Sequence, residues 1–275
     1  MTMLINGKQT DQLCATDRGL QYGDGLFETI AVMDGRCPFW DRHMLRLQTG
    51  CQRLQLPAPE IALLQSEALS LIKNKSRAVL KLIISRGEGG RGYRYPESVP
   101  STRILMRHPW PDYPVQNGQQ GVQLRFCDTT LARQPRLAGL KHLNRLEQVL
   151  ARNEWQDANI AEGLMLDENG NVIEGTISNV FMLQNGILVT PDLSHCGVAG
   201  IMRERLLELA AKAGINIQIG NITKEQLLEA DEIFISNSLI GLWPVKQLNG
   251  QTFTIGDTSR KLQMLINRDM PLIHV

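Results

Sequence analysis

Lys141 is the residue of this sequence best suited to covalent chemistry with an aldehyde. It stands between an apolar, glycine-containing segment, residues 137–140, and a run of leucines at helical spacing. Apolar surroundings lower the pKa of a lysine from its free value of about 10.4, and the neutral amine is the form that attacks an aldehyde carbon. A lysine at such a position can also extend into solvent, so the position alone leaves both interpretations open.

Glu174 is a second candidate, because it interrupts an otherwise apolar stretch, residues 172–181, just after the turn at residues 167–170. Thr176 and Ser178 follow it closely. A carboxylate followed by small and hydroxyl residues in a strand suits a partly buried polar site. The exposed end of a hairpin would have the same pattern, so both interpretations remain.

Two segments could bind an anion. At residues 197–203 a glycine-containing turn runs into a helical pattern, and the free N–H groups of a helix start can hold a phosphate. A simple helix start explains the same residues, and the absence of a following Gly-Lys-Ser/Thr excludes a P-loop. Arg42, Arg46 and Arg53 share a narrow arc of one predicted helix. A solvated charged face is the default interpretation, and periodicity does not choose among the three arginines.

The glycine cluster at residues 86–93 formally contains Gly-x-Gly-x-x-Gly after the apolar run at residues 79–84. A dinucleotide-binding fingerprint must open a helix, whereas residues 93–96 (Tyr-Arg-Tyr-Pro) break one. The segment is therefore either a plain strand connection or a loop whose arginines and tyrosine bind carboxylates.

Strands and helices must position these residues. Asn6-Gly7, Asp34-Gly35 and Asn185-Gly186 each lie between apolar runs and predict tight hairpins. Three groups of apolar residues recur at helical spacing: Met44, Leu47, Cys51 and Leu54; Leu143, Leu146 and Leu150; and Leu206, Leu207 and Ala210. Hairpins with helices between them predict an α+β fold.

Residues 107–121 carry three prolines and a polar run, which makes them the best candidate for a domain boundary. We predict a smaller N-terminal α+β domain at 1–112, a linker at 113–120 and a larger C-terminal α+β domain at 121–275 that carries Lys141.

Composition narrows the class of protein. The 275 residues carry a formal net charge of +1, so no overall field favours nucleic acid or an anionic membrane. No run of about 18 apolar residues predicts a membrane helix, and the first residues lack the pattern of a signal peptide. The five cysteines form no Cys-x-x-Cys pair and the histidines no His-Glu-x-x-His, so a reduced, cytoplasmic location without a metal site is expected.

The order of these segments resembles the fold-type IV pyridoxal phosphate enzymes, the family of branched-chain and D-amino acid aminotransferases. The resemblance rests on residues 17–29, Arg46, residues 86–93, Lys141, Glu174 and residues 200–203, and it spans the whole chain. It implies a two-domain, D-amino acid aminotransferase-like α+β architecture, pyridoxal 5'-phosphate as the cofactor, a small-molecule substrate and a homodimer.

Within the family, residues 139–148, 86–93 and 200–203 are most similar to the members that convert 4-amino-4-deoxychorismate to p-aminobenzoate and pyruvate in folate biosynthesis. An aminotransferase acting on D- or branched-chain amino acids is the alternative, because the same scaffold serves both reactions.

The resemblance also implies roles for single residues. Lys141 would hold the cofactor as a Schiff base and move the proton, and Glu174 would pair with the pyridine nitrogen. The cofactor phosphate would be bound by Arg46, Ile201, Met202, Asn237 and Ser238. Thr29 would protonate the leaving group, and Arg91 and Tyr93 would bind a substrate carboxylate.

Overall fold

The computed structural model describes residues 2–96 and 99–270, and the chain separates into two compact units. Unit 1 comprises Met1–Pro111 together with Leu140–Asn144, and unit 2 comprises Asp112–Gly139 and Arg145–Val275. The short segment that carries Lys141 thus packs with unit 1, although it lies far along the sequence. The division of the chain into the domains 1–112 and 121–275 stays a prediction.

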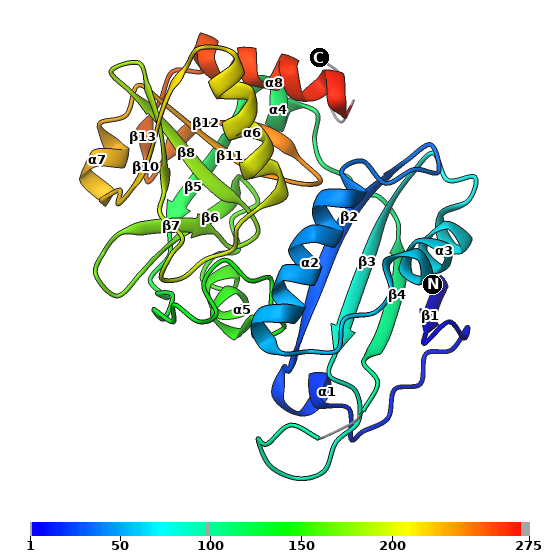
Figure 1. The fold of residues 1–275 in the computed structure, drawn as a ribbon. Coiled ribbons are helices and arrows are strands. Elements are labelled where there is room, and N and C mark those ends of the chain that lie inside the picture. The colour runs from blue at the N-terminus through cyan, green and yellow to red at the C-terminus, as the bar shows by residue number, and fades with distance from the viewer. Residues whose placement is uncertain (1, 97–98, 271–275) are drawn as a thin grey trace. The chain divides into compact units, whose positions relative to one another are not determined.

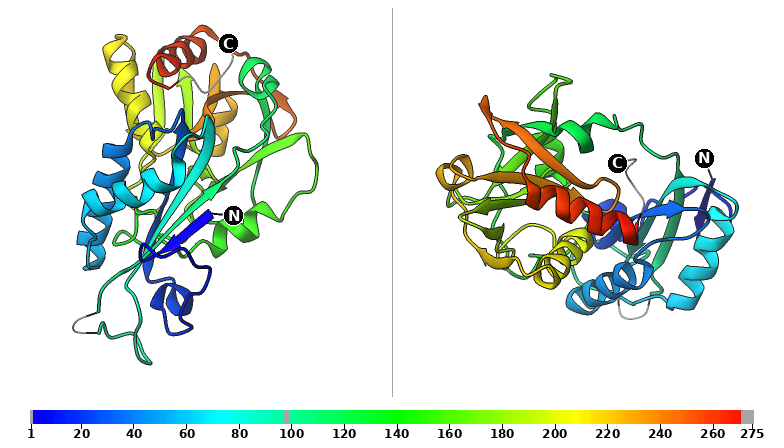
Figure 2. Two further views of the ribbon diagram at one scale, coloured as in Figure 1. Left: turned by 90° about the vertical axis from the view of Figure 1, so that its right-hand side faces the viewer. Right: turned by 90° about the horizontal axis from the view of Figure 1, so that it is seen from above.

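Unit 1 is built on a four-stranded antiparallel sheet in the order β1-β4-β3-β2 (Figure 1). Helices α2 and α3 cover one face of this sheet (Figure 2). The elements are β1 (Thr2–Ile5), α1 (Arg18–Tyr22), β2 (Gly25–Met33), α2 (Trp40–Leu54), α3 (Ile61–Ile72), β3 (Arg77–Ser85) and β4 (Thr102–His108).

Successive side chains of β2 point to opposite faces of the sheet, and the two faces differ in burial. Leu26 and Glu28 are buried on the face that α2 covers, where a Cβ on Gly50 of α2 would clash with the Leu26 side chain. Phe27 and Thr29 point to the opposite face and are only half-buried. One face of β2 therefore belongs to the core, and the other presents side chains outside it.

Unit 2 contains a nine-stranded mixed sheet in the order β10-β9-β8-β11-β12-β5-β6-β7, with β13 paired to β12. An additional pairing between β7 and β8 closes six of the strands into a barrel-like ring. Its strands are β5 (Val122–Phe126), β6 (Ile160–Leu166), β7 (Val172–Gly175), β8 (Asn179–Gln184), β9 (Ile187–Pro191), β10 (Asn216–Gly220), β11 (Glu232–Asn237), β12 (Gly241–Leu248) and β13 (Gln251–Thr252).

The helices of unit 2 pack around this sheet (Figure 1). Helix α6 packs on β11, and α8 packs on both β11 and β12. The helices of this unit are α4 (Gln116–Gln120), α5 (Leu146–Arg152), α6 (Ile201–Lys212), α7 (Lys224–Leu228) and α8 (Asp257–Asp269). The rings of Phe181 and Phe234 stack with 4.9 Å between their centroids, so the hydrophobic core is continuous across β8 and β11. The predicted α+β class is confirmed.

All three predicted glycine turns form with positive φ at both central residues. Only Asn185-Gly186 joins two extended paired strands, β8 and β9, because Asn6-Gly7 and Asp34-Gly35 are each followed by a single bridge. Two predicted helices match α2 and α6. The third begins only at Leu146, so the prediction that Leu143 belongs to it was wrong.

Within the described part of the chain, no helix has both the length and the apolar character required to cross a membrane.

Candidate functional site

Lys141 lies in unit 1 against the free edge of β2. The Lys141 carbonyl accepts a hydrogen bond from the Phe27 N–H at 2.9 Å, and the Leu143 N–H donates to the Gly25 carbonyl at 3.0 Å. The half-buried Lys141 side chain places Nζ 4.5 Å from the centroid of the Phe27 ring. The backbone pairing therefore fixes Lys141 beside the face of β2 that is turned away from the core.

Thr29 lies on that same face of β2, two residues beyond Phe27. Its partner across the sheet is Lys81 of β3, whose Nζ lies 5.5 Å from the centroid of the Phe27 ring. The structure thus brings the predicted residues Lys141 and Thr29 to one face of unit 1. Sequence reasoning did not find Lys81, because an isolated lysine in a strand has no distinguishing pattern.

Arg46 is bound to a buried carboxylate. Its Nε donates to Glu28 Oε1 at 2.8 Å, a second guanidinium nitrogen donates to Glu28 Oε2, and His43 Nδ1 lies 2.6 Å from the same Oε2. Burial alone would raise the pKa of Glu28, but Arg46 and His43 lower it to about 2. Glu28 is therefore ionised at neutral pH and accepts from both neighbours.

His43 is a neutral member of this cluster. Burial lowers its pKa, and the charges of Arg46 and Lys141 lower it further, whereas Glu28 raises it. Since ionised Glu28 can only accept, the proton of the imidazole is assigned to Nδ1. Arg46 and Lys141, the two cations of unit 1 that are predicted to contact the cofactor, therefore both lower the pKa of the His43 imidazole.

The three arginines on α2 are not equivalent. Arg53 is exposed, as a solvated charged face predicts, but Arg46 is largely buried against Glu28. The default interpretation was thus wrong for Arg46. Two signals were available in the sequence: an acidic residue inside the apolar strand at residues 25–33, and His43 one helical turn before Arg46.

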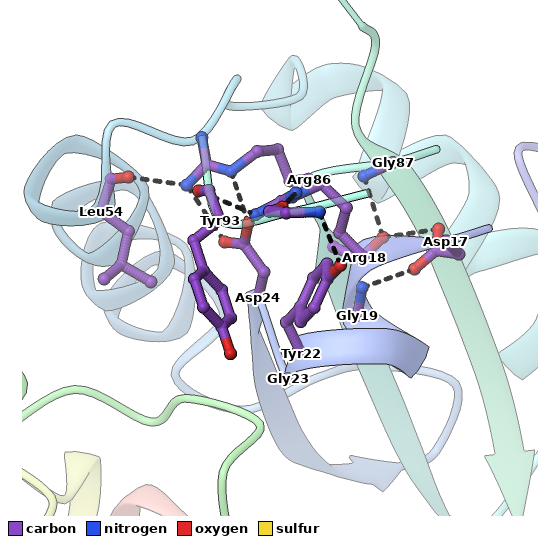
Figure 3. A network of polar contacts seen from close by, with 12 residues as sticks. Asp17, Arg18, Gly19, Tyr22, Gly23, Asp24, Leu54, Arg86, Gly87 and Tyr93 are labelled. Carbon is purple, nitrogen blue, oxygen red and sulfur yellow. Dashed lines mark hydrogen bonds and ion pairs between the residues drawn. The ribbon is translucent and has the colours of Figure 1, made fainter. Parts of the chain in front are cut away.

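The loop that follows β3 is fixed by a carboxylate between two buried arginines (Figure 3). Asp24 Oδ2 accepts from Arg18 Nε at 2.9 Å and from Arg86 Nε at 2.7 Å. Arg86 also donates to the carbonyls of Leu54 and Gln55 at the end of α2. No helix follows β3 among the described residues of this loop, which agrees with the exclusion of a dinucleotide fold.

Arg18 and Tyr22 form hydrogen bonds to the backbone of the loop. Arg18 donates to the carbonyls of Gly92 and Tyr93, and the Tyr22 hydroxyl accepts from the Gly92 N–H at 3.1 Å. The ring of Tyr93 packs edge-on against that of Tyr22, with 84% of Tyr93 exposed (Figure 3). Arg91 is also exposed. An ordered backbone thus presents two exposed side chains that suit a carboxylate ligand.

Glu174 of β7 is buried in unit 2, which favours the polar-site interpretation over the exposed end of a hairpin. Its Oε2 accepts from the Val198 N–H at 2.8 Å, and the residue pairs with Asn179 across the β7–β8 turn. Burial lowers the pKa of Arg145 while the charges of Glu174 and Glu147 raise it, so a cation lies within electrostatic reach of Glu174.

The predicted phosphate seat is the start of α6. Gly200 is its N-cap residue and has no side chain to accept the N–H groups of Ile201 and Met202. A Cβ at position 200 would fall on Asn179 Oδ1, so only glycine fits beside this amide. Asn179 Nδ2 donates to the Val198 carbonyl at 2.9 Å. No N-cap side chain therefore competes with an anion for the N–H groups at this helix start.

Asn237 and Ser238 lie at the end of β11 in the same unit. Asn237 Oδ1 accepts from the N–H groups of Leu239 and Ile240 at 2.8 and 3.0 Å, and Nδ2 donates to the Ile177 carbonyl at 3.1 Å. The hydrogen bonds of the Asn237 side chain therefore stabilise a turn at the end of β11. Ser238 lies in this turn.

Residues 25–248 match the family model described as amino-transferase class IV. The chain is 37% identical to an aminodeoxychorismate lyase of Vibrio harveyi over 268 residues, which cover 96% of this chain and 98% of that protein. It is 30% identical to a D-alanine aminotransferase of Bacillus licheniformis over 276 residues, covering 93% and 91%. The crystal structure of 4-amino-4-deoxychorismate lyase from Pseudomonas aeruginosa superposes with a TM-score of 0.94 and 48% identity, covering 98% of this chain and 99% of that one.

Proposed function

We propose that this chain, which belongs to the amino-transferase class IV family, is a pyridoxal phosphate-dependent lyase that converts 4-amino-4-deoxychorismate to p-aminobenzoate and pyruvate in folate biosynthesis. The proposal rests on one observation: over nearly its full length, the chain is more similar to these lyases than to the aminotransferase. Identity is 37% and 48% to the two lyases but 30% to the D-alanine aminotransferase.

The residues present fit pyridoxal phosphate by their chemistry. At the start of α6, Gly200 has no side chain that would compete with a phosphate for the N–H groups, and the buried carboxylate of Glu174 suits a protonated ring nitrogen. In unit 1, Lys141 supplies an amine and Arg46 a guanidinium whose orientation Glu28 fixes.

We assign the phosphate to the Arg46 guanidinium, to the N–H groups of Ile201 and Met202, and to Ser238. Asn237 contributes through the turn that it shapes, since its amide oxygen already accepts two backbone hydrogen bonds. Lys141 Nζ would hold the aldehyde carbon until the substrate amine takes its place and frees the lysine. Glu174 holds a proton at the ring nitrogen through its carboxylate, and the Val198 N–H orients that carboxylate.

The bound cofactor supplies an electron sink for negative charge that develops beside the substrate amine. Lys141 Nζ takes the proton from the amine-bearing ring carbon, as a general base on the β2 edge. Thr29 donates its hydroxyl proton to the departing enolpyruvyl oxygen and regains a proton from the lysine ammonium, and the released enolpyruvate tautomerises to pyruvate. Loss of the ring proton and of that group leaves an aromatic ring, which favours the elimination over the reverse reaction.

Arg91 and Tyr93 bind a carboxylate of the dicarboxylate substrate. Both side chains are exposed on a loop whose backbone Arg18 and Tyr22 hold. A guanidinium offers two parallel N–H donors to a carboxylate, and the tyrosine hydroxyl adds a third.

The reaction is tested by incubating the purified protein with 4-amino-4-deoxychorismate. We expect stoichiometric p-aminobenzoate and pyruvate. A D-amino acid or branched-chain amino acid with 2-oxoglutarate should give no glutamate at a comparable rate. Glutamate without any aromatic product would instead identify an aminotransferase.

The cofactor lysine is tested by borohydride reduction followed by peptide mass spectrometry. A pyridoxyl adduct on the peptide that carries Lys141 is expected. An adduct on another lysine, such as Lys81, would overturn the assignment while leaving the reaction itself open to measurement.

We also propose that the enzyme is a cytoplasmic homodimer. Leu146, Val149 and Leu150 lie at i, i+3 and i+4 on α5, and 76%, 53% and 62% of their surfaces are exposed. Such an apolar helix face favours burial against a second copy of the chain. Substituting Val149 and Leu150 by Glu should shift the mass measured by light scattering from dimer to monomer, whereas a monomeric wild type would contradict the proposal.

A further inference from the structure

Glu162 of β6 is a buried carboxylate that neither the sequence analysis nor the proposed reaction uses. Only 2% of its surface is exposed. Oε1 accepts from the Thr176 hydroxyl at 2.6 Å and from the Thr176 N–H at 3.1 Å. Oε2 accepts from the Ile177 N–H at 3.1 Å and the Ser178 hydroxyl at 3.0 Å. Burial raises the pKa of Glu162, and these donors oppose that rise.

Apart from the N–H of the adjacent Gly163, which donates to Oε1 at 3.0 Å, the donors belong to one short turn. Residues 176–178 connect β7 to β8, and Glu174 and Asn179 pair across the base of the turn. A Cβ on Gly175 would clash with both the Glu162 side chain and the Ser178 hydroxyl. Glu162 thus holds three of the four residues between Glu174 and Asn179, and it fixes how these two side chains leave the sheet.

The two residues at the base of this turn determine the position of the chain that leads into α6. Glu174 accepts from the Val198 N–H, and Asn179 donates to the Val198 carbonyl, so one residue is held from both sides. Val198 precedes Gly200 by two residues, and Asn179 Oδ1 occupies the place of a Cβ on Gly200. The position of the helix start therefore depends on the turn.

The middle of the turn determines the second part of the seat. The Ile177 carbonyl accepts from Asn237 Nδ2, and Asn237 in turn organises the turn that presents Ser238. The turn and the two residues that flank it, Glu174 and Asn179, are thus in contact with both backbone segments to which the phosphate is assigned. A change in their conformation must move both.

We propose that Glu162 is a positioning residue for the cofactor seat, which aligns Glu174, the start of α6 and the Asn237–Ser238 turn through its hydrogen bonds to residues 176–178. The inference rests on the proposed function, because that function assigns these segments to the cofactor. Glu162 itself touches neither cofactor nor substrate in this role.

Glu162→Gln tests the proposal in the full-length apoprotein. A glutamine must place its NH₂ group against the N–H of Thr176 or of Ile177, and two donors repel. We expect the affinity for pyridoxal phosphate to fall roughly tenfold or more. Affinity for pyridoxal, which lacks the phosphate, should fall less, so the ratio of the two dissociation constants should change.

Glu232→Gln is the matched control. Glu232 is 6% exposed, begins β11 at the end opposite to Asn237, and accepts from the N–H groups of Thr258 and Ser259 at the start of α8. This variant should lose about as much stability against urea as Glu162→Gln does. It should keep the wild-type ratio of the dissociation constants for pyridoxal phosphate and pyridoxal. Equal ratios for the two variants would overturn the proposal, because Glu162 would then serve stability alone.

Thr176→Val keeps the test decisive if Glu162→Gln does not fold, since it removes one hydroxyl donor and leaves the carboxylate in place. It should change the affinity ratio in the same direction by a smaller factor, and an unchanged ratio would count against Glu162. A wild type that binds pyridoxal phosphate but releases no p-aminobenzoate would overturn only the proposed reaction. A wild type that does not bind the cofactor would overturn both.

Discussion

Glu28 accepts hydrogen bonds from two nitrogens of Arg46, and this pair links the core face of β2 to the cation that we assign to the cofactor phosphate. Replacing Arg46 by Met should weaken cofactor binding and also leave a buried carboxylate without its cation. Breaking a buried pair in this way costs roughly 3–5 kcal/mol. Equilibrium dissociation of pyridoxal phosphate and urea unfolding measure the two effects.

The double variant Arg46→Met with Glu28→Gln separates those effects. Removing both charges should restore most of the stability but none of the affinity, because no guanidinium returns. Recovery of affinity in the double variant would show that Arg46 does not bind the phosphate.

The same cluster predicts that the protein loses stability in acid. The pKa of Glu28 is lowered from 4.5 to about 2, so its contribution is complete above about pH 4.5 and is lost as the pH falls toward 2. The shift corresponds to about 3 kcal/mol. Burial also lowers the pKa of His43, so the unfolded chain takes up a proton first as the pH falls below about 6.5.

Urea unfolding at pH 7, 5 and 3.5 checks this dependence. The wild type should lose stability at each step, whereas Glu28→Gln should be less stable at pH 7 and lose less between pH 5 and 3.5. Parallel losses in the two proteins would assign acid sensitivity to other groups.

The sequence could predict those parts of the candidate site whose chemistry follows from a residue and its immediate neighbours. Lys141 and Glu174 stand out as charged residues in apolar segments, and the start of α6 follows from a glycine before a helical pattern. The sequence left Glu174 either in a buried polar site or at the exposed end of a hairpin. Only the structure decides between the two, because the burial of Glu174 depends on the strands that cover β7 and not on the sequence around it.

The residues that sequence missed act across long separations. Glu28 meets Arg46, and Glu162 meets Thr176, only after strands and helices have paired. The helix predicted from Leu143 failed for a related reason. Leu143 pairs its backbone with Gly25 of β2, and that pairing prevents it from joining α5, which begins at Leu146. Periodicity cannot represent such a competing tertiary contact.

Thr29→Val should reduce the turnover number roughly a hundredfold, because the leaving oxygen loses its proton donor. The half-buried position of Thr29 on the face it shares with Phe27 tolerates the isosteric valine. Binding of the cofactor and the KM for the substrate should stay near the wild-type values, and Thr29→Ser should retain most of the activity. A large rise in KM without loss of turnover would assign Thr29 to substrate binding.

Asp24→Asn should release the loop at residues 86–95. The substitution leaves the buried guanidinium groups of Arg18 and Arg86 without their shared carboxylate, and Arg18 can then no longer hold the Gly92 carbonyl firmly. Trypsin should cleave after the exposed Arg91 several times faster than in the wild type, and the KM for the dicarboxylate substrate should rise. Asp41→Asn, at an exposed position in the first turn of α2, is the control and should change neither quantity. Faster cleavage with an unchanged KM would mean that Asp24 orders the loop but that Arg91 and Tyr93 do not bind the substrate.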